Sequence, residues 1–228
     1  MDETLKKQLE ITACKVRLGI LEGVFNAKSG HPGGSLSIAD LLTYLYFAKM
    51  NVYPDKPEEP ERDRLVLSKG HTAPALYATL AEKGFFPKEE LKSLRHIGAM
   101  LQGHPCISIP GVDMSSGSLG QGISVACGMA LSGKLTSDTY KVYTILGDGE
   151  IEEGQVWEAA MFAAHYKLDN LVAVVDNNGL QIDGKIEDVM SPYPIVENNV
   201  SWHGSAPNKE QYEQAVAEIN EQLKSLEG

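Results

Sequence analysis

The chain has 228 residues, which is enough for one generous domain with a substantial core but leaves no room for a second catalytic domain. Its 43% apolar content is typical of a soluble globular protein, and no apolar run approaches the roughly 20 residues that a membrane span needs. With 20 basic and 31 acidic side chains the net charge is −11, which repels nucleic acids and anionic membranes and requires any anionic substrate to be attracted locally.

The first expected elements are two helices joined by a glycine-rich turn. Apolar residues recur at steps of three and four from Leu9 to Val24, which predicts a long amphipathic helix that Gly30 ends. Ser37 is expected to cap the next helix, whose apolar face comes from residues 38–45. A surface loop rich in proline and glutamate follows.

The rest of the chain alternates between short apolar runs, typical of buried strands, and segments with helical periodicity. This alternation predicts an α/β fold in which a parallel sheet is flanked by helices on both faces. We expect a single domain over residues 1–228 with its core in residues 5–184. The expected strands are 64–67, 142–146 and 171–175, and the expected helices are 75–81, one opened by Pro87, one up to about Leu131, one from about Gln155 to Phe162, and 208–226.

Polar and glycine residues follow two of the expected strands. Gly147-Asp148-Gly149 comes after the strand at 142–146, and Asn177-Asn178 comes after the strand at 171–175. Both pieces therefore lie at carboxyl ends of strands, where open parallel sheets bind ligands. Oxygens of Asp148, Asn178 and the Leu180 carbonyl suit a Mg²⁺ ion shared with a diphosphate. The flanking glycines allow backbone N–H groups to approach the diphosphate closely. A Gly-Asp-Gly turn alone is also an ordinary tight turn, but two such strand ends favour a cofactor site.

Five motifs in family order give the chain a resemblance to the cofactor diphosphate-binding half of transketolase, in particular to the amino-terminal subunit of split transketolases. The resemblance covers residues 5–184, and Trp202-His203-Gly204 is similar to one further motif. The motifs are Lys28-Ser29-Gly30-His31-Pro32-Gly33-Gly34, Ser68-Lys69-Gly70-His71, Gly103-His104-Pro105, Gly117-Ser118-Leu119-Gly120-Gln121-Gly122 and, counted together as the fifth, the two strand-end pieces.

The resemblance implies thiamine diphosphate and Mg²⁺ as cofactors, with Asp148, Asn178 and the Leu180 carbonyl as metal ligands. It also implies that Glu153 and Glu158 lie at a subunit interface. The residues that it places on the cofactor are His71, Gly117, Leu119, Gly149, Asn178, Ile182 and His203.

Four histidines, His31, His71, His104 and His203, are similar to the family's channel histidines, which bind sugar hydroxyls and move protons. Cleavage of a ketose beside its carbonyl needs a proton to be removed and later returned near neutral pH, and imidazole has a pKa that permits both. A single histidine beside glycine and proline can simply serve a turn. The four together, at strand ends and in loops, favour a catalytic site.

The chain departs from the family in two places. It has no pyrimidine-binding domain, which in the family carries the glutamate that activates the cofactor, so we expect the chain to be inactive without a partner polypeptide. Transketolases also place a further strand, helix and strand before the histidine that His203 resembles, whereas here only a linker at residues 190–200 intervenes. The expected assembly is a homodimer of this chain or a heterotetramer with the partner.

The leading interpretation is a transketolase subunit that transfers a two-carbon ketol unit from a ketose phosphate to an aldose phosphate in the pentose phosphate pathway. The alternatives are an enzyme like deoxyxylulose-phosphate synthase and a non-catalytic cofactor-binding or assembly protein. The amino end has no basic region followed by an apolar stretch, and the three cysteines are widely spaced, which favours a cytoplasmic protein with reduced thiols.

Overall fold

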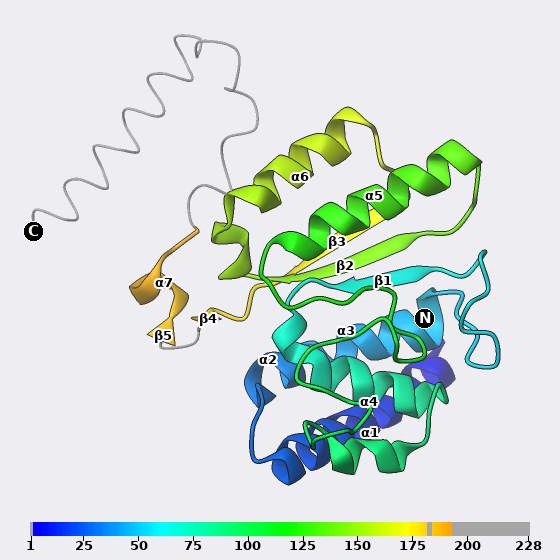
Figure 1. The fold of residues 1–228 in the computed structure, drawn as a ribbon, viewed down its shortest axis with the longest axis vertical. Coiled ribbons are helices and arrows are strands. Elements are labelled where there is room, and N and C mark those ends of the chain that lie inside the picture. Colours follow the sequence, from blue (N-terminus) through cyan, green and yellow to red (C-terminus); the bar gives the residue numbers. More distant parts are fainter. Residues whose placement is uncertain (1, 182–183, 193–228) are drawn as a thin grey trace, which may run out of the picture. The chain divides into compact units, whose positions relative to one another are not determined.

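In a computed structural model of the protein, which describes residues 2–181 and 184–192, the three expected strands form one parallel sheet. They are β1 (Arg64–Leu67), β2 (Val142–Gly147) and β3 (Leu171–Asp176), hydrogen-bonded in the order β1-β2-β3 (Figure 1). Val142 pairs with Arg64 on one side and with Leu171 on the other, so the strands are aligned and their carboxyl ends meet at one edge of the sheet.

Helices cover both faces of this sheet (Figure 1). One face carries α1 (Glu3–Ala27) and α4 (Ala73–Lys83), and the other carries α5 (Gln121–Thr136) and α6 (Gly154–His165). The prediction of an α/β fold with a parallel sheet between helices is therefore confirmed. The remaining elements are α2 (Pro32–Ser37), α3 (Ala39–Tyr44), the π-helical turn η1 (Leu45–Lys49), the 3-10 helices η2 (Gly70–Thr72), η3 (Lys88–Ser93) and η4 (Glu150–Glu152), a hairpin of β4 (Leu180–Gln181) and β5 (Gly184–Lys185), and α7 (Ile186–Val189).

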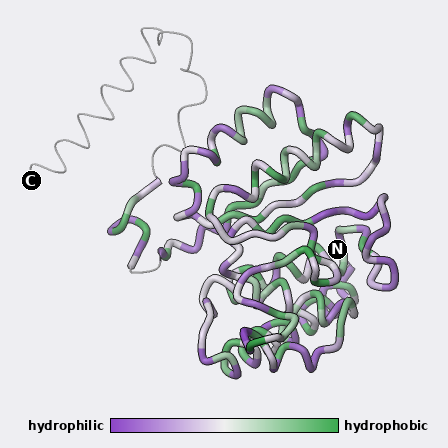
Figure 2. Tube along the Cα trace, in the orientation of Figure 1, coloured by the Kyte–Doolittle hydropathy of each residue, from purple (hydrophilic) through white to green (hydrophobic). Residues whose placement is uncertain are grey.

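Alternating side chains of β1 and β2 contribute to two cores, one on each face of the sheet. Leu65 and Tyr143 are buried with residues of α1, α3 and α4, whereas Val66 and Val142 are buried with residues of α5 and α6. Hydrophilic residues gather instead in the loop that joins η1 to β1 (Figure 2). Within the described residues, none of the helices combines the length and the apolar character that crossing a membrane requires.

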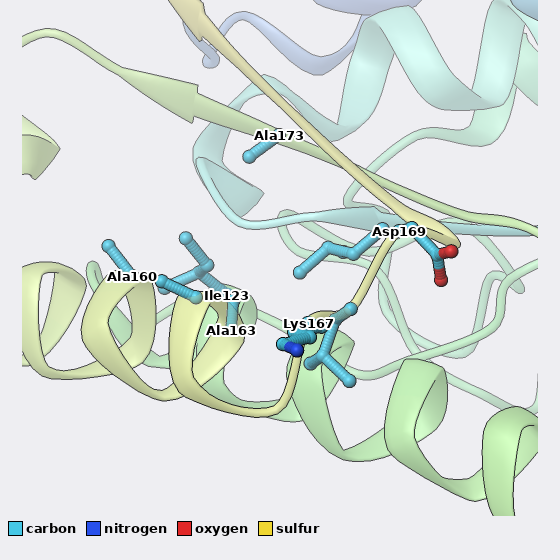
Figure 3. A pocket seen from close by; sticks show the side chains of 9 residues that line it. Ile123, Ala160, Ala163, Lys167, Asp169 and Ala173 are labelled. Carbon is cyan, nitrogen blue, oxygen red and sulfur yellow. The ribbon is translucent and has the colours of Figure 1, made fainter.

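β3 is the most exposed strand of the sheet. Among the described residues it pairs with β2 alone, and the side chains of Val172 and Val175 are partly open to solvent. An open groove of about 500 Å³ lies between β3, α5 and α6, and its walls are mostly alanine and leucine (Figure 3). It is lined by the turn at residues 167–169, which enters β3, so it lies at the amino end of the strand, away from the carboxyl ends.

Two helix ends differ from the sequence-based expectation. α1 ends at Ala27 and not at Gly30, because Lys28 already adopts the left-handed conformation, with φ 51°, and its N–H bonds the Phe25 carbonyl. Pro87 does open a helical segment, but as the extended residue before the short 3-10 helix η3 and not as the first residue of an α-helix.

The expected role of Ser37 as a helix cap is wrong. Ser37 is the last residue of α2, and Ile38 occupies the cap position of α3 without a side-chain hydrogen bond. The physical reason is a competing acceptor, since the Ser37 hydroxyl donates to the Asp176 carboxylate at 2.7 Å. The residue therefore connects the helical layer to the end of β3.

Two glycines of α5 provide a matched test of the packing around this edge. A Cβ added to Gly122 would lie 2.6 Å from the Ser68 Cα, whereas a Cβ added to Gly128 would meet nothing within 4 Å. We expect Gly122→Ala to lower the free energy of unfolding by about 1–3 kcal/mol, because the Ser68 backbone has to move. Gly128→Ala should raise it by up to about 1 kcal/mol through better helix propensity. Urea unfolding followed by circular dichroism measures both, and equal effects would contradict the close approach.

Candidate active site

Each strand of the sheet leads directly into a turn that carries polar side chains. β1 leads into Ser68-Lys69-Gly70-His71, β2 leads into Asp148-Gly149-Glu150, and β3 ends at Asp176, which precedes Asn177-Asn178. Because the strands are parallel and neighbours in the order β1-β2-β3, the three turns meet at one edge of the sheet. This edge is the candidate active site.

A buried carboxylate, Glu150, joins three segments of this edge. It accepts hydrogen bonds from the Ser68 hydroxyl, from the Gly120 N–H at 2.8 Å and from the Gly147 N–H at 3.0 Å. The bonds connect the ends of β1 and β2 to the glycine-rich loop before α5. No local sequence pattern indicates this role, because the Ser68 and Gly120 partners lie 82 and 30 residues away along the chain.

A buried ion pair joins the ends of β1 and β3. The Lys69 Nζ lies 2.5 Å from the Asp176 Oδ2, and the two side chains are only 2% and 11% exposed. Asp176 also accepts hydrogen bonds from Ser37 and from the Asn178 amide. Burial acts to raise the pKa of Asp176, but the hydrogen bonds from Lys69 and Ser37 outweigh it and lower this pKa. No local sequence pattern indicated a role for Lys69 or Asp176.

The two residues expected to bind the metal, Asp148 and Asn178, lie on adjoining turns. The Asp148 carboxylate is buried and accepts hydrogen bonds from the Gly149 N–H at 2.9 Å and from the Gly179 N–H at 2.7 Å. The Asn178 amide nitrogen donates to Asp176, and its oxygen accepts from the Leu180 N–H at 3.0 Å. Both side chains are therefore held in defined orientations next to one another.

The donor chemistry of this pair fits Mg²⁺ bound together with a diphosphate. One carboxylate, one amide and a backbone carbonyl are hard oxygen donors, and they leave coordination positions open for phosphate oxygens and water. In the part of the chain that the structure describes, no group of three or more His, Cys, Asp or Glu side chains could hold a metal ion.

Three of the expected histidines converge on the same edge. The rings of His31 and His71 are 5.0 Å apart, centroid to centroid, in an edge-to-face arrangement. A Cβ added to Gly117 would lie 3.2 Å from the His104 ring, and one added to Gly70 would lie 2.8 Å from the Gly117 nitrogen. The glycines thus allow the loop before α5 to pass between the His71 turn and His104.

The surroundings of the histidines favour their neutral form. The pKa of His71 is lowered to about 4, first by burial and then by the nearby His31, Lys69 and His104. The pKa of His31 is also lowered, by burial and by Arg95 and His104. Near pH 7 both imidazoles are therefore uncharged and able to accept a proton.

The other expected site residues are placed less completely. Leu119 and Leu180 are exposed near this edge, where a ligand or a second chain can reach them. Ile182 and His203 lie outside the described residues. Arg95 was missed by the sequence analysis, although its guanidinium donates to the Ser29 hydroxyl at 2.6 Å beside His31.

The lowered pKa of His71 predicts a loss of stability in acid. The unfolded chain, in which a histidine has a pKa of about 6.5, binds more protons than the fold, so stability present above pH 6.5 is lost as the pH falls towards about 4. We expect His71→Gln to flatten this decrease, with no change of slope above pH 7. Urea unfolding between pH 4 and 8 measures it, with the exposed His96→Gln as the control. A wild-type slope in His71→Gln would contradict the assignment.

The chain has clear relatives. Residues 9–225 match the family described as transketolase, thiamine diphosphate binding domain. The chain is 40% identical to an apulose-4-phosphate transketolase subunit of Phocaeicola vulgatus, over 96% of both chains. It is 45% identical to the 6-deoxy-6-sulfo-D-fructose transketolase subunit SqwG of Clostridium sp. (strain MSTE9), over 96% of this chain and 81% of the relative.

Longer transketolases are similar to the chain over part of their length. Human transketolase is 44% identical over 89% of this chain, which corresponds to 33% of the human protein. The crystal structure of transketolase from Campylobacter jejuni matches with a TM-score of 0.78 at 34% identity, over 84% of this chain and 31% of that one. The chain therefore spans about a third of the length of these proteins.

The alignment with the Phocaeicola subunit is longer than the chain. It runs over 270 positions, whereas the chain has 228 residues, although 96% of each protein is covered. The relative therefore has residues without a counterpart in this chain. A segment missing before His203 remains a prediction, because the alignment length does not place the difference along the chain.

Proposed function

Because the chain belongs to the transketolase family of thiamine diphosphate-binding domains, we propose that it is the amino-terminal subunit of a two-chain transketolase. The observation that carries the proposal is the convergence of Asp148, Asn178 and three histidines on one strand-end edge. Two relatives of comparable length are named as transketolase subunits, which supports a division of the enzyme between two polypeptides.

We assign the cofactor contacts by residue. Asp148, Asn178 and the Leu180 carbonyl would hold Mg²⁺, which bridges to the diphosphate of the cofactor. The fixed orientations of the Asp148 carboxylate and the Asn178 amide support this role. The further contacts proposed for the cofactor are His71, Gly117, Leu119, Gly149, Ile182 and His203.

The histidines would perform the proton transfers. When bound, thiamine diphosphate supplies the electron sink for cleavage of the ketose. His31, His71 and His104, with His203, would bind the sugar hydroxyls and exchange their protons. The lowered pKa values of His31 and His71 support this role, because a neutral imidazole can take a proton from a hydroxyl.

We propose that the substrates are anionic sugars, with a ketose phosphate as donor and an aldose phosphate as acceptor in the pentose phosphate pathway. The two relatives of comparable length are named for apulose 4-phosphate and for 6-deoxy-6-sulfo-D-fructose, both of which carry an anionic group. The chain has a net charge of −11, so Arg95 beside His31 would attract such a substrate locally. A cytoplasmic location is part of the same proposal.

The partner subunit would dock on α6 and the active-site edge. Glu153 and Glu158 are exposed there, and the same helix exposes the apolar side chains Met161 and Phe162. Interfaces that close an active site between two chains often bury more than ~2,000 Å² of total surface. We propose a homodimer of this chain, or a heterotetramer with the partner subunit.

Metal-dependent cofactor binding tests the site. We expect Asp148→Ala to weaken thiamine diphosphate binding by at least tenfold in the presence of Mg²⁺, because the ion loses its carboxylate ligand. The matched control is Asp169→Ala, which removes an exposed carboxylate paired with Lys134 at the other end of the strands. Isothermal titration calorimetry measures both. Unchanged affinity in a folded Asp148→Ala variant would refute the metal assignment.

The requirement of a partner subunit for turnover tests the proposed two-chain transketolase. We expect the purified chain to show no ketol transfer from hydroxypyruvate or a ketose phosphate, and to gain turnover when a pyrimidine-domain subunit is added. The reason is that the chain supplies only the diphosphate half of the cofactor site. A coupled assay of the aldehyde product measures transfer from the ketose phosphate, and release of carbon dioxide measures transfer from hydroxypyruvate. Turnover without the partner would overturn the two-chain proposal, and none with a partner that binds would favour a non-catalytic cofactor-binding protein.

A further inference from the structure

The first helix has two apolar faces, and only one of them is covered. Ala13, Val16, Ile20 and Gly23 are buried where α1 packs against α3, α4 and η3. On the opposite side, Leu18 is 67% exposed and Phe25 is 81% exposed. The outer stripe, as we call this exposed set, consists of Ile11, Cys14, Leu18, Leu21 and Phe25.

The spacing of the outer stripe is that of a helix-pairing seam. Its members recur at steps of three, four, three and four residues, which is the 3.5-residue period of two helices that pack side by side. Exposed apolar residues scattered singly need no explanation, but a continuous row along most of a helix is typical of an interaction surface. The stripe lies on the face of α1 opposite to its packed face, so it is not used by the fold or by the proposed site.

The charges beside the outer stripe are self-complementary. Lys15 and Glu22 follow the stripe residues Cys14 and Leu21, and both are exposed. The Glu22 carboxylate also lies 3.7 Å from the Lys92 Nζ of the same chain, in a long, solvent-exposed ion pair that leaves it able to pair with a second copy. In an antiparallel pair of α1 helices, Lys15 of each copy lies next to Glu22 of the other, which gives two equivalent ion pairs. A surface that is complementary to itself favours a second copy of this chain over an unrelated partner.

The side-chain volumes select the same arrangement. In the antiparallel register, Leu18 meets Leu21 of the second copy, and the small Cys14 meets the large Phe25. A parallel pair would instead place Phe25 against Phe25 and Cys14 against Cys14, which leaves one layer overfilled and another underfilled. The antiparallel arrangement packs better, because it places a large residue across from a small one.

We propose that the outer stripe of α1 is a docking surface for a second copy of this chain, in an antiparallel two-fold arrangement. The surface is separate from the α6 surface considered for the partner subunit, since α1 and α6 cover opposite faces of the sheet (Figure 1). Both can therefore be occupied at once. A contact through one helix is small, so the dissociation constant is expected in the micromolar range or weaker.

Sedimentation velocity of the full chain, without cofactor or partner, tests the stripe. Between ~5 and ~200 μM we expect the wild-type chain to reach twice the sedimenting mass of the Leu18→Lys variant. If the variant also reaches this larger mass, it should need at least ten times the concentration that wild type needs. The control is Leu135→Lys, which changes a leucine 78% exposed at the end of α5 and should behave as wild type. Equal masses of wild type and Leu18→Lys, both folded by circular dichroism, would overturn the proposal.

A charge exchange tests the antiparallel register. Lys15→Glu and Glu22→Lys should each weaken association several-fold, and the double variant should restore it, because the pairs form between copies. Failure of the double variant to restore association would overturn the register.

Oxidation is a second test of the register. Antiparallel packing keeps the two Cys14 thiols apart and therefore gives no Cys14–Cys14 disulfide. Efficient cross-linking through Cys14 would contradict the antiparallel arrangement.

Discussion

The ion pair between Lys69 and Asp176 is the interaction on which the active-site edge depends. It joins the ends of β1 and β3 across the end of β2, and it is almost completely buried. Burying two charges costs solvation free energy, and removing one partner of such a pair typically destabilises a protein by about 3–5 kcal/mol. Because Asp176 also holds the Asn178 amide and the Ser37 hydroxyl, the pair fixes the orientation of a proposed metal ligand.

Around this pair the edge is assembled from buried acids and close backbone approaches. Glu150 gathers two backbone N–H groups and a hydroxyl, and Asp148 gathers two further N–H groups. The glycines of the loop before α5 leave no side chain in the way, as at Gly122 against Ser68. The result is a preorganised edge, whose polar groups are held in fixed orientations before the proposed cofactor binds.

The three strands that carry the site are complete, even though β3 has an exposed side. Lys69, Asp148 and Asp176 belong to β1, β2 and β3 or to the turns that follow them. The groove beside β3 lies at the other end of the strand, away from this edge. The outer stripe of α1, proposed above as a docking surface, lies on the opposite face of the sheet from α5 and α6.

The sequence by itself determined the three strands of the sheet, the helices that cover its faces and the fold class, because the signals for them are local. Apolar periodicity placed β1, β2 and β3 almost to the residue, and glycine with Asp148 or Asn178 after a strand indicated the binding edge. Only the tertiary structure decided which polar groups meet. Ser37 and Asp176 are 139 residues apart in the chain, and Lys69 and Asp176 are 107 residues apart. No local pattern encodes such contacts, because they exist only once parallel strands from distant segments align their ends and exclude water from the groups between them.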